Sequence, residues 1–232
     1  MNQLILLAAG DSKRAKQNKL WADVFGQPLW FYTLETFLNQ KSLNEIILVV
    51  KGSEMKKFGK YLENKKEISE TKCMPIIRLV AGGKNRAESF LKGLESIEYQ
   101  EKDIIIDHNA ANPNVTGKEI SEVIKQAKKY GAAAVSLPCV DTIISYDGNF
   151  YRQTYDRNKL RLMQTPQAVR GDILKKISVN KSTDLSSLIL KKYKVRLVEA
   201  DRSNKKITFA EDIASLAAHS FIGEDSHRFS NT

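Results

Sequence analysis

The sequence predicts an α/β fold in which a mainly parallel, twisted sheet is flanked by helices in a Rossmann-like arrangement, with a protruding β-arm. Two observations predict this class. Short, continuous apolar runs alternate with helical patterns over most of the chain, and polar–apolar alternation replaces them after Pro138. The chain has 232 residues, of which 42% are hydrophobic, enough for one substantial core. We therefore expect one domain over residues 1–218 and a tail over residues 219–232.

The parallel strands are predicted by four apolar runs of the kind that a sheet buries on both faces. They read "LILLAA" at 4–9, "EIILVV" at 45–50, "DIIID" at 103–107 and "AAAVSLP" at 132–138. One helical pattern begins near Pro28 and continues through "TLETFL". Another follows Thr116, which forms a capping box with Glu119, and Gly131 closes it. Ligands of such a sheet bind beyond the carboxyl ends of its strands.

The β-arm is predicted at about residues 139–160, where the alternating pattern surrounds Asp147-Gly148, a two-residue hairpin signal. The chain then returns to mixed structure, with "VRLVEA" as a further strand. Thr208 and Glu211 form a second capping box before a last helix.

The net charge of the sequence indicates which classes of partner to expect. The formal net charge is +10, but the lysines are scattered along the chain rather than gathered in one stripe. An acidic small molecule fits this charge as well as nucleic acid does. A basic nucleic-acid binder is the weaker alternative, because the sequence has no recognised nucleic-acid module. We expect no nucleic-acid partner.

The two cysteines, Cys73 and Cys139, have neither disulfide-framework nor zinc-ligand spacing, which favours a reducing cytoplasm. The first apolar run is too short for a signal segment, and no later run approaches the length of a membrane span. We expect a cytoplasmic protein with no membrane partner.

The stretch "LLAAGDSKRAKQNKL", residues 6–20, predicts a phosphate site after the first strand. Small residues there let backbone N–H groups approach a phosphate or a base closely. Arg14 can grip phosphate oxygens, Lys19 acts as a point charge, and together they can stabilise charge at a pentacovalent phosphorus. The spacing matches neither a Walker loop nor a dinucleotide fingerprint.

This stretch, followed by "GQPLWFYTLETF", resembles the A-A-G-x-S-x-R…K…G-x-P signature of nucleotidyltransferases. Five further segments resemble, in the right order, motifs of the 2-C-methyl-D-erythritol 4-phosphate cytidylyltransferase family of the non-mevalonate isoprenoid pathway. They read "AGGKNRAESFLKGL", "VDTI", "YDRNKLRLMQTPQA", "STDLSS" and "SNKKITFAEDI", and with the first motif they span roughly residues 3–218. The first motif alone would also admit molybdopterin or ribitol-phosphate nucleotidyltransferases.

The resemblance implies transfer of CMP from CTP to 2-C-methyl-D-erythritol 4-phosphate with release of pyrophosphate. Arg14 and Lys19 would bind the triphosphate, and Lys206 and Arg157 would bind the acceptor. The other implied substrate contacts are Ala8, Ala9, Gly10, Ser12, Gly83, Arg86, Ser89, Asn109, Thr142 and Thr183. Arg157 would reach the neighbouring subunit, so a homodimer through the β-arm is implied.

The chemistry expected of such a site needs no general base, because the attacking phosphate-monoester oxygen is already anionic near neutral pH. Positioning and charge neutralisation by lysine, arginine and a Mg²⁺ ion bridging the CTP phosphates suffice. We expect no metal ligands from the protein itself. His108, at a strand end, is expected to be structural.

Three departures from the family pattern leave alternatives open. The usual H-D-A-A-R-P reads "HNAANP" here, so that Asn109 replaces an aspartate and Asn112 an arginine. Leu185 takes the second acidic position of T-D-D. The alternatives are a ribitol-5-phosphate or other polyol-phosphate cytidylyltransferase, and a catalytically silent homologue that acts as a scaffold.

The tail carries a separate signal. "FIGEDSHRF", residues 221–229, resembles the opening of 2-C-methyl-D-erythritol 2,4-cyclodiphosphate synthase, with Asp225 and His227 at zinc-ligand positions. Two ligands cannot form a zinc site alone. The chain is therefore interpreted as resembling the first part of a fusion of the two enzymes, with the tail as a disordered remnant.

Overall fold

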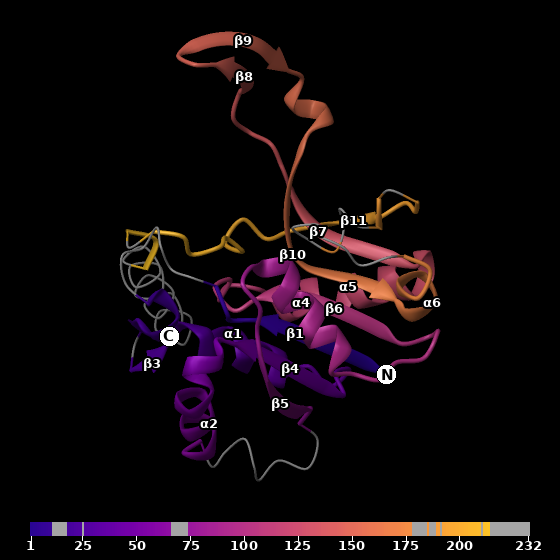
Figure 1. The fold of residues 1–232 in the computed structure, drawn as a ribbon. Coiled ribbons are helices and arrows are strands. Elements are labelled where there is room, and N and C mark those ends of the chain that lie inside the picture. Colours follow the sequence, from indigo (N-terminus) through magenta and orange to yellow (C-terminus); the bar gives the residue numbers. More distant parts are fainter. Residues whose placement is uncertain are drawn as a thin grey trace, which may run out of the picture.

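A seven-stranded sheet forms the centre of the molecule (Figure 1). The computed structural model describes residues 1–10, 18–24, 26–65, 74–177, 185, 189–190, 192–209 and 211–213. The strand order is β11-β7-β10-β6-β1-β4-β5. The strands are β1 (Asn2–Leu7), β4 (Glu45–Val50), β5 (Ile76–Ala81), β6 (Ile104–Asn109), β7 (Ala132–Pro138), β10 (Arg161–Arg170) and β11 (Arg196–Glu199). Only β10 runs antiparallel to its neighbours in this sheet, which confirms the mainly parallel prediction.

Helices cover both faces of the sheet. They are α1 (Leu29–Leu38), α2 (Met55–Glu63), α4 (Arg86–Glu95), α5 (Gly117–Tyr130) and α6 (Gly171–Leu174). Short 3₁₀ turns are η2 (Lys19–Trp21), η3 (Gly52–Glu54) and η4 (Arg157–Lys159), and β2 (Asp23–Val24) pairs with β3 (Gln27–Pro28). No helix among the described residues is long and apolar enough to cross a membrane.

The continuous apolar runs have a physical reason, because alternate side chains of each strand enter different cores. Leu4 and Leu6 of β1 pack in the cluster that includes residues of α1, α2 and α5. Ile5 and Leu7 pack in the cluster that includes residues of α4 and α6. A strand covered on both faces has no polar side to present, so its sequence cannot alternate.

The caps of α5 confirm the sequence prediction. The Thr116 hydroxyl accepts the Glu119 N–H at 3.2 Å, and Glu119 Oε2 accepts the Thr116 N–H at 2.7 Å. Gly131 ends the helix with φ of +92°, and a Cβ there would lie 2.3 Å from Ile173 Cδ1. Glycine is therefore required at this position for both conformation and space.

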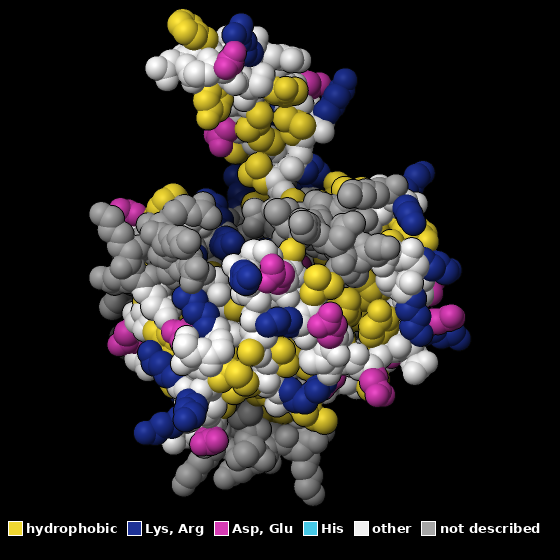
Figure 2. Space-filling model, viewed as in Figure 1, with side chains coloured by type: hydrophobic (Ala, Val, Ile, Leu, Met, Phe, Trp, Pro, Cys, Tyr) yellow, Lys and Arg dark blue, Asp and Glu magenta, His cyan; other side chains and the backbone are white. Residues whose placement is uncertain are grey.

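The β-arm is formed by β8 (Ile143–Asp147) and β9 (Phe150–Tyr155) and stands away from the sheet (Figure 1). The predicted turn position needs a correction by one residue. Asp147 pairs with Phe150, so the two loop residues are Gly148 and Asn149, with Gly148 at φ of +56°. Tyr146, Phe150 and Tyr151 are 73%, 74% and 61% exposed. Figure 2 shows apolar side chains gathered on the arm.

Two strands of the seven-stranded sheet have no counterpart in the prediction, and neither does the short β2–β3 pair. β5 is half-exposed at the sheet edge, and β10 reads "RLMQTPQAVR", which mixes polar residues and Pro166 with few apolar ones. Neither gives a continuous apolar run.

Near the C-terminus, the carboxylate of Asp212 accepts the N–H groups of Thr208 and Phe209 at 2.7 and 2.8 Å. The sequence predicts Glu211 for this capping role. Residues 214–232, with the tail, lie outside the described part.

Candidate active site

The carboxyl ends of β1, β4, β5 and β6 meet at one edge of the sheet, where ligands of such folds bind. Backbone bonds continue the ladders beyond the strands. The Ala8 N–H donates to the Val49 carbonyl at 2.7 Å, and the Gly82 N–H donates to the Val50 carbonyl at 2.7 Å. Ala8 is buried, whereas Gly10 is exposed. The first predicted substrate contacts thus emerge from the core onto this edge.

A close approach between two strand ends shapes the edge. A Cβ at Gly82 would lie 2.5 Å from the Ala9 Cβ and 2.9 Å from Ser89 Oγ, so no side chain fits there. The buried Ser89 hydroxyl accepts the Gly83 N–H at 3.1 Å and donates to the Asn85 carbonyl at 2.8 Å. The structure therefore brings Ala9, Gly83 and Ser89 together. Gly82 was missed by sequence reasoning, although the double glycine was a visible signal.

Arg86, the first residue of α4, binds the end of β6. Its Nη2 lies 2.8 Å from Asp107 Oδ2, and its Nε donates to Asn109 Oδ1 at 3.1 Å. Asp107 is fully buried, and a buried carboxylate is stabilised by such a charged partner. Arg86 and Asn109 are thus in direct contact. Asp107 was also missed, and the signal for it was a charged residue that ends an apolar run.

The two asparagines that depart from the family pattern lie in a network of side-chain hydrogen bonds. Asn109 Nδ2 lies 3.3 Å from Thr165 Oγ1 and 3.4 Å from Asn112 Oδ1. The buried Asn112 donates through Nδ2 to Asn204 Oδ1 at 3.3 Å. Leu185, the third departure, is a buried member of the cluster on the α4 side of the sheet. Each departure is therefore accommodated by local packing or hydrogen bonding.

His108 is buried and does not open onto the edge. Its Nε2 faces the Asn112 carbonyl oxygen at 3.3 Å, and its ring packs against Phe37 with centroids 4.9 Å apart. Burial, which disfavours the charged imidazolium, lowers its pKa from 6.5 to about 3. The imidazole is therefore neutral near pH 7, which agrees with a structural role.

Lys19 and the loop that carries Lys206 lie together. Lys19 belongs to η2, which is fixed through Trp21, whose ring lies 4.8 Å from that of Phe58. Lys19 Nζ donates to the Ile207 carbonyl at 2.6 Å. Lys206 itself is exposed. The two cations that the sequence assigns to different substrates are thus adjacent to one short segment.

Other predicted contacts are on the β-arm or outside the described residues. Thr142 and Arg157 are exposed and belong to the arm, which stands away from the sheet (Figure 1). Arg157 Nη1 donates to the Val140 carbonyl at 2.8 Å. Among the described residues, a single chain does not bring these two side chains to the predicted contacts at the sheet edge. Ser12, Arg14 and Thr183 lie outside the described residues.

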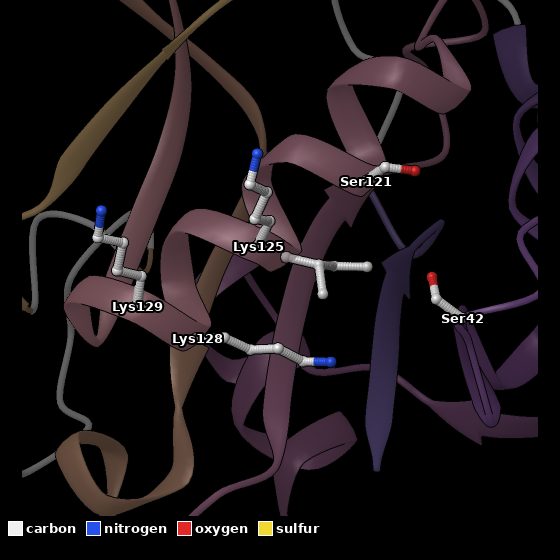
Figure 3. A pocket seen from close by; sticks show the side chains of 6 residues that line it. Ser42, Ser121, Lys125, Lys128 and Lys129 are labelled. Carbon is white, nitrogen blue, oxygen red and sulfur yellow. The ribbon is translucent and has the colours of Figure 1, made fainter.

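A surface hollow of about 560 Å³ lies elsewhere, between α5 and the segment before β4 (Figure 3). It is lined by Ser42, Ser121, Ile124, Lys125, Lys128 and Lys129. Ser42 precedes β4, so the hollow lies at the amino ends of the strands, opposite the expected ligand edge. Across the described ranges, no group of three or more His, Cys, Asp or Glu side chains is placed to hold a metal ion.

Comparison with known proteins agrees with this geometry. The family model for 2-C-methyl-D-erythritol 4-phosphate cytidylyltransferase matches residues 3–222. The enzyme of that name from Bacillus velezensis is 34% identical over 90% of this chain and 91% of its own length. The crystal structure of 4-diphosphocytidyl-2C-methyl-D-erythritol synthase from Anaerococcus prevotii is 26% identical, with a TM-score of 0.78, over 94% of this chain and 95% of that one.

A bifunctional IspDF from Campylobacter jejuni is also similar. It is 26% identical with a TM-score of 0.72, and the match covers 92% of this chain and 53% of that protein. The family model spans the strand-end loops, the β-arm and the Lys206 segment. The chain therefore belongs to the 2-C-methyl-D-erythritol 4-phosphate cytidylyltransferase family.

Proposed function

We propose that this chain transfers the cytidylyl group of CTP to 2-C-methyl-D-erythritol 4-phosphate and releases pyrophosphate. The observation that carries the proposal is the family match over residues 3–222, which includes the strand-end residues described above. The small residues and backbone groups at the edge form the side that receives the nucleotide. The cations of η2 and of the segment after β11 form the side where phosphates meet.

The nucleotide is held at the ends of β1 and β5 in this proposal. Ala8, Ala9 and Gly83 leave the backbone accessible, and a pyrimidine edge can be read by rigid main-chain donors and acceptors. Gly10, Ser12, Arg86, Ser89 and Asn109 complete the pocket. Because the Arg86 guanidinium is already paired with the Asp107 carboxylate, its main role is to hold the end of β6 in place beside the nucleotide. It adds little net positive charge for the phosphates. Arg14 and Lys19 bind the triphosphate.

The acceptor is held by Lys206, Thr142, Arg157 and Thr183. Arg157 lies on the exposed arm, so we propose that it serves the site of a second subunit in a homodimer. Exposed aromatic side chains on the arm support this, because large apolar surfaces of this kind mark protein interfaces.

The reaction is an in-line displacement at the α-phosphorus of CTP. An oxygen of the acceptor phosphate forms a bond to that phosphorus, and the bond to the bridging oxygen of the β-phosphate breaks. Pyrophosphate leaves with the electron pair, and its charge is neutralised by Lys19 and Arg14. No proton has to be removed from the nucleophile, so the neutral, buried His108 takes no part.

A Mg²⁺ ion accompanying CTP would supply further neutralisation of the phosphate charge. The described side chains do not form a protein cage for it, and the Asp107 carboxylate at the edge is already bound to Arg86. We further propose a cytoplasmic location, which the absence of disulfide-framework cysteine spacing in the sequence supports.

A pyrophosphate-release panel tests the proposal by crossing CTP, UTP, ATP and GTP with 2-C-methyl-D-erythritol 4-phosphate and ribitol 5-phosphate. We expect release with CTP and the methylerythritol acceptor to exceed every other pair. If release with CTP and ribitol 5-phosphate is greater, the acceptor of the reaction is ribitol 5-phosphate rather than 2-C-methyl-D-erythritol 4-phosphate. Absence of release with all eight pairs, from a folded protein, would leave the silent scaffold that Asn109 and Asn112 suggested.

A further inference from the structure

A buried asparagine outside the predicted contacts lies at the centre of the polar network. Asn204 is fully buried and makes three side-chain hydrogen bonds. Its Nδ2 donates to Glu119 Oε1 at 3.1 Å and to the Thr165 carbonyl at 3.0 Å. Its Oδ1 accepts the Asn112 Nδ2 at 3.3 Å. One side chain thus links α5, β10 and the loop after β6 to the segment after β11.

The partners of Asn204 are themselves fixed. Glu119 is buried, and its Oε2 is engaged in the α5 capping box with Thr116. Its Oε1 also accepts the Asp201 N–H at 3.0 Å. Because Glu119 cannot rotate without losing the cap, it presents one oxygen to the segment as a rigid acceptor. The amide of Asn204 therefore binds to a preset position rather than to a mobile side chain.

A second anchor follows three residues later. The Ile207 N–H donates to the Ala111 carbonyl at 2.8 Å, and the Ile207 side chain is buried beside Val24 and Leu29. The Ile207 carbonyl accepts Lys19 Nζ. Lys206 is exposed between the two anchors. A backbone held on both sides of Lys205 and Lys206 limits the directions in which the Lys206 side chain can project.

We propose that Asn204 is a positioning residue, which fixes the segment so that Lys206 meets the acceptor phosphate. The inference rests on the proposed role of Lys206 in acceptor binding. Positioning of this kind lowers the barrier because the charge is already in place when the two anionic substrates meet. The effect of Asn204 on the reaction should therefore be transmitted through Lys206.

The first test is Asn204→Asp, which keeps the shape of the side chain. It replaces the Nδ2 donor by a carboxylate oxygen, which repels the Glu119 and Thr165 oxygens that accepted from Nδ2. We expect kcat/KM for the acceptor to fall roughly 10²-fold, as for a misplacement of about 1 Å. The KM for the acceptor should rise more than the KM for CTP, because Ile207 keeps its own anchor beside Lys19. If the aspartate variant does not fold, Asn204→Ala, which introduces no charge, is used instead. The KM for the acceptor is again compared with the KM for CTP.

The control is Asn114→Asp. Asn114 Nδ2 donates to the Ser203 carbonyl at 3.2 Å, so it contacts the same segment, but from an exposed position. We expect this variant to keep wild-type kcat/KM. Activities are compared at a temperature at which circular dichroism shows every variant folded. An Asn204 variant that lowers only the melting temperature, with kcat and both KM values unchanged, would overturn the proposal.

Coupling to Lys206 separates this inference from the proposed function. In a Lys206→Ala background, Asn204→Asp should lower kcat/KM for the acceptor by less than about 2-fold. The reason is that the effects of two substitutions do not add when the two residues act as a unit. A full additional loss in that background would overturn the positioning role and leave the proposed function intact. Wild-type activity of Lys206→Ala alone would instead refute the acceptor role of Lys206, and this inference with it.

Discussion

At the scale of single residues, the site is organised by hydrogen bonds that cross between elements. The Arg86–Asp107 pair joins α4 to β6, and Asn204 joins the segment after β11 to α5 and β10. The phosphate-binding role of the strand-end loop stays a prediction, because Ser12 and Arg14 lie outside the described residues. Asn204 was not predictable. Its contact with Asn112 spans 92 positions and depends on how β10 and β11 pack beside β7.

Lys19 gives the most direct residue-scale prediction. Lys19→Ala should lower kcat by about 10²-fold or more, because it removes charge stabilisation at the transition state. Its Nζ donates to the Ile207 carbonyl, and a hydrogen bond of this kind contributes about 1 kcal/mol to stability, so we expect the melting temperature to fall by a few degrees. Steady-state kinetics and a thermal melt check this. Lys56→Ala, an exposed lysine of α2, is the matched control and should behave as wild type.

His108 predicts a pH dependence of stability rather than of catalysis. Its pKa is about 3 in the folded protein and 6.5 in the unfolded chain, so the unfolded state binds the proton more readily. Its contribution is therefore fully present above pH 6.5 and is lost as the pH falls from 6.5 towards 3. Denaturant unfolding at several pH values should show a steeper loss between pH 6.5 and 5 for wild type than for His108→Asn. Equal slopes would contradict the buried, neutral imidazole.

At the scale of elements, the sequence predicted strands where burial on both faces leaves a continuous apolar run. It failed at β10, whose polar residues form hydrogen bonds beside the candidate site: Thr165 contacts Asn109 and Asn204 there. The hairpin position was shifted by one residue because Asp147-Gly148 and Gly148-Asn149 are both suitable two-residue loops. Element types thus follow from local pattern, whereas edges and turns depend on pairing partners.

The β-arm carries the element-scale prediction. Tyr146→Ser with Phe150→Ser should raise the dimer dissociation constant about 10-fold or more, because each exposed aromatic would lose interface burial worth about 1 kcal/mol. Sedimentation across a dilution series measures this constant. The kcat/KM for the acceptor should fall in parallel on dilution, since Arg157 would no longer reach a second site. Ile76→Ser, which changes an exposed apolar residue of β5, is the control. Unchanged dimerisation would refute the arm as the interface.

At the scale of the whole molecule, the chain combines a rigid sheet edge with a protruding arm. The edge presents the strand ends and the Lys206 segment, and the arm, which stands away from the sheet (Figure 1), carries Thr142 and Arg157, two of the residues proposed to bind the acceptor. Family membership was predictable because its motifs occur in order along nearly the full chain, and the match over residues 3–222 confirms it. The three departures from the family pattern could not be weighed from sequence, since only packing shows that Asn112 and Leu185 are buried and accommodated.

The most direct measurement is mass-spectrometric analysis of the purified protein incubated with CTP, Mg²⁺ and 2-C-methyl-D-erythritol 4-phosphate. Cytidylyl transfer predicts equal amounts of 4-diphosphocytidyl-2-C-methyl-D-erythritol and pyrophosphate, with both lost in Lys19→Ala and retained in Lys56→Ala. A folded wild-type protein that consumes no CTP, or one that forms the product equally well without Lys19, would contradict cytidylyl transfer at this edge of the sheet.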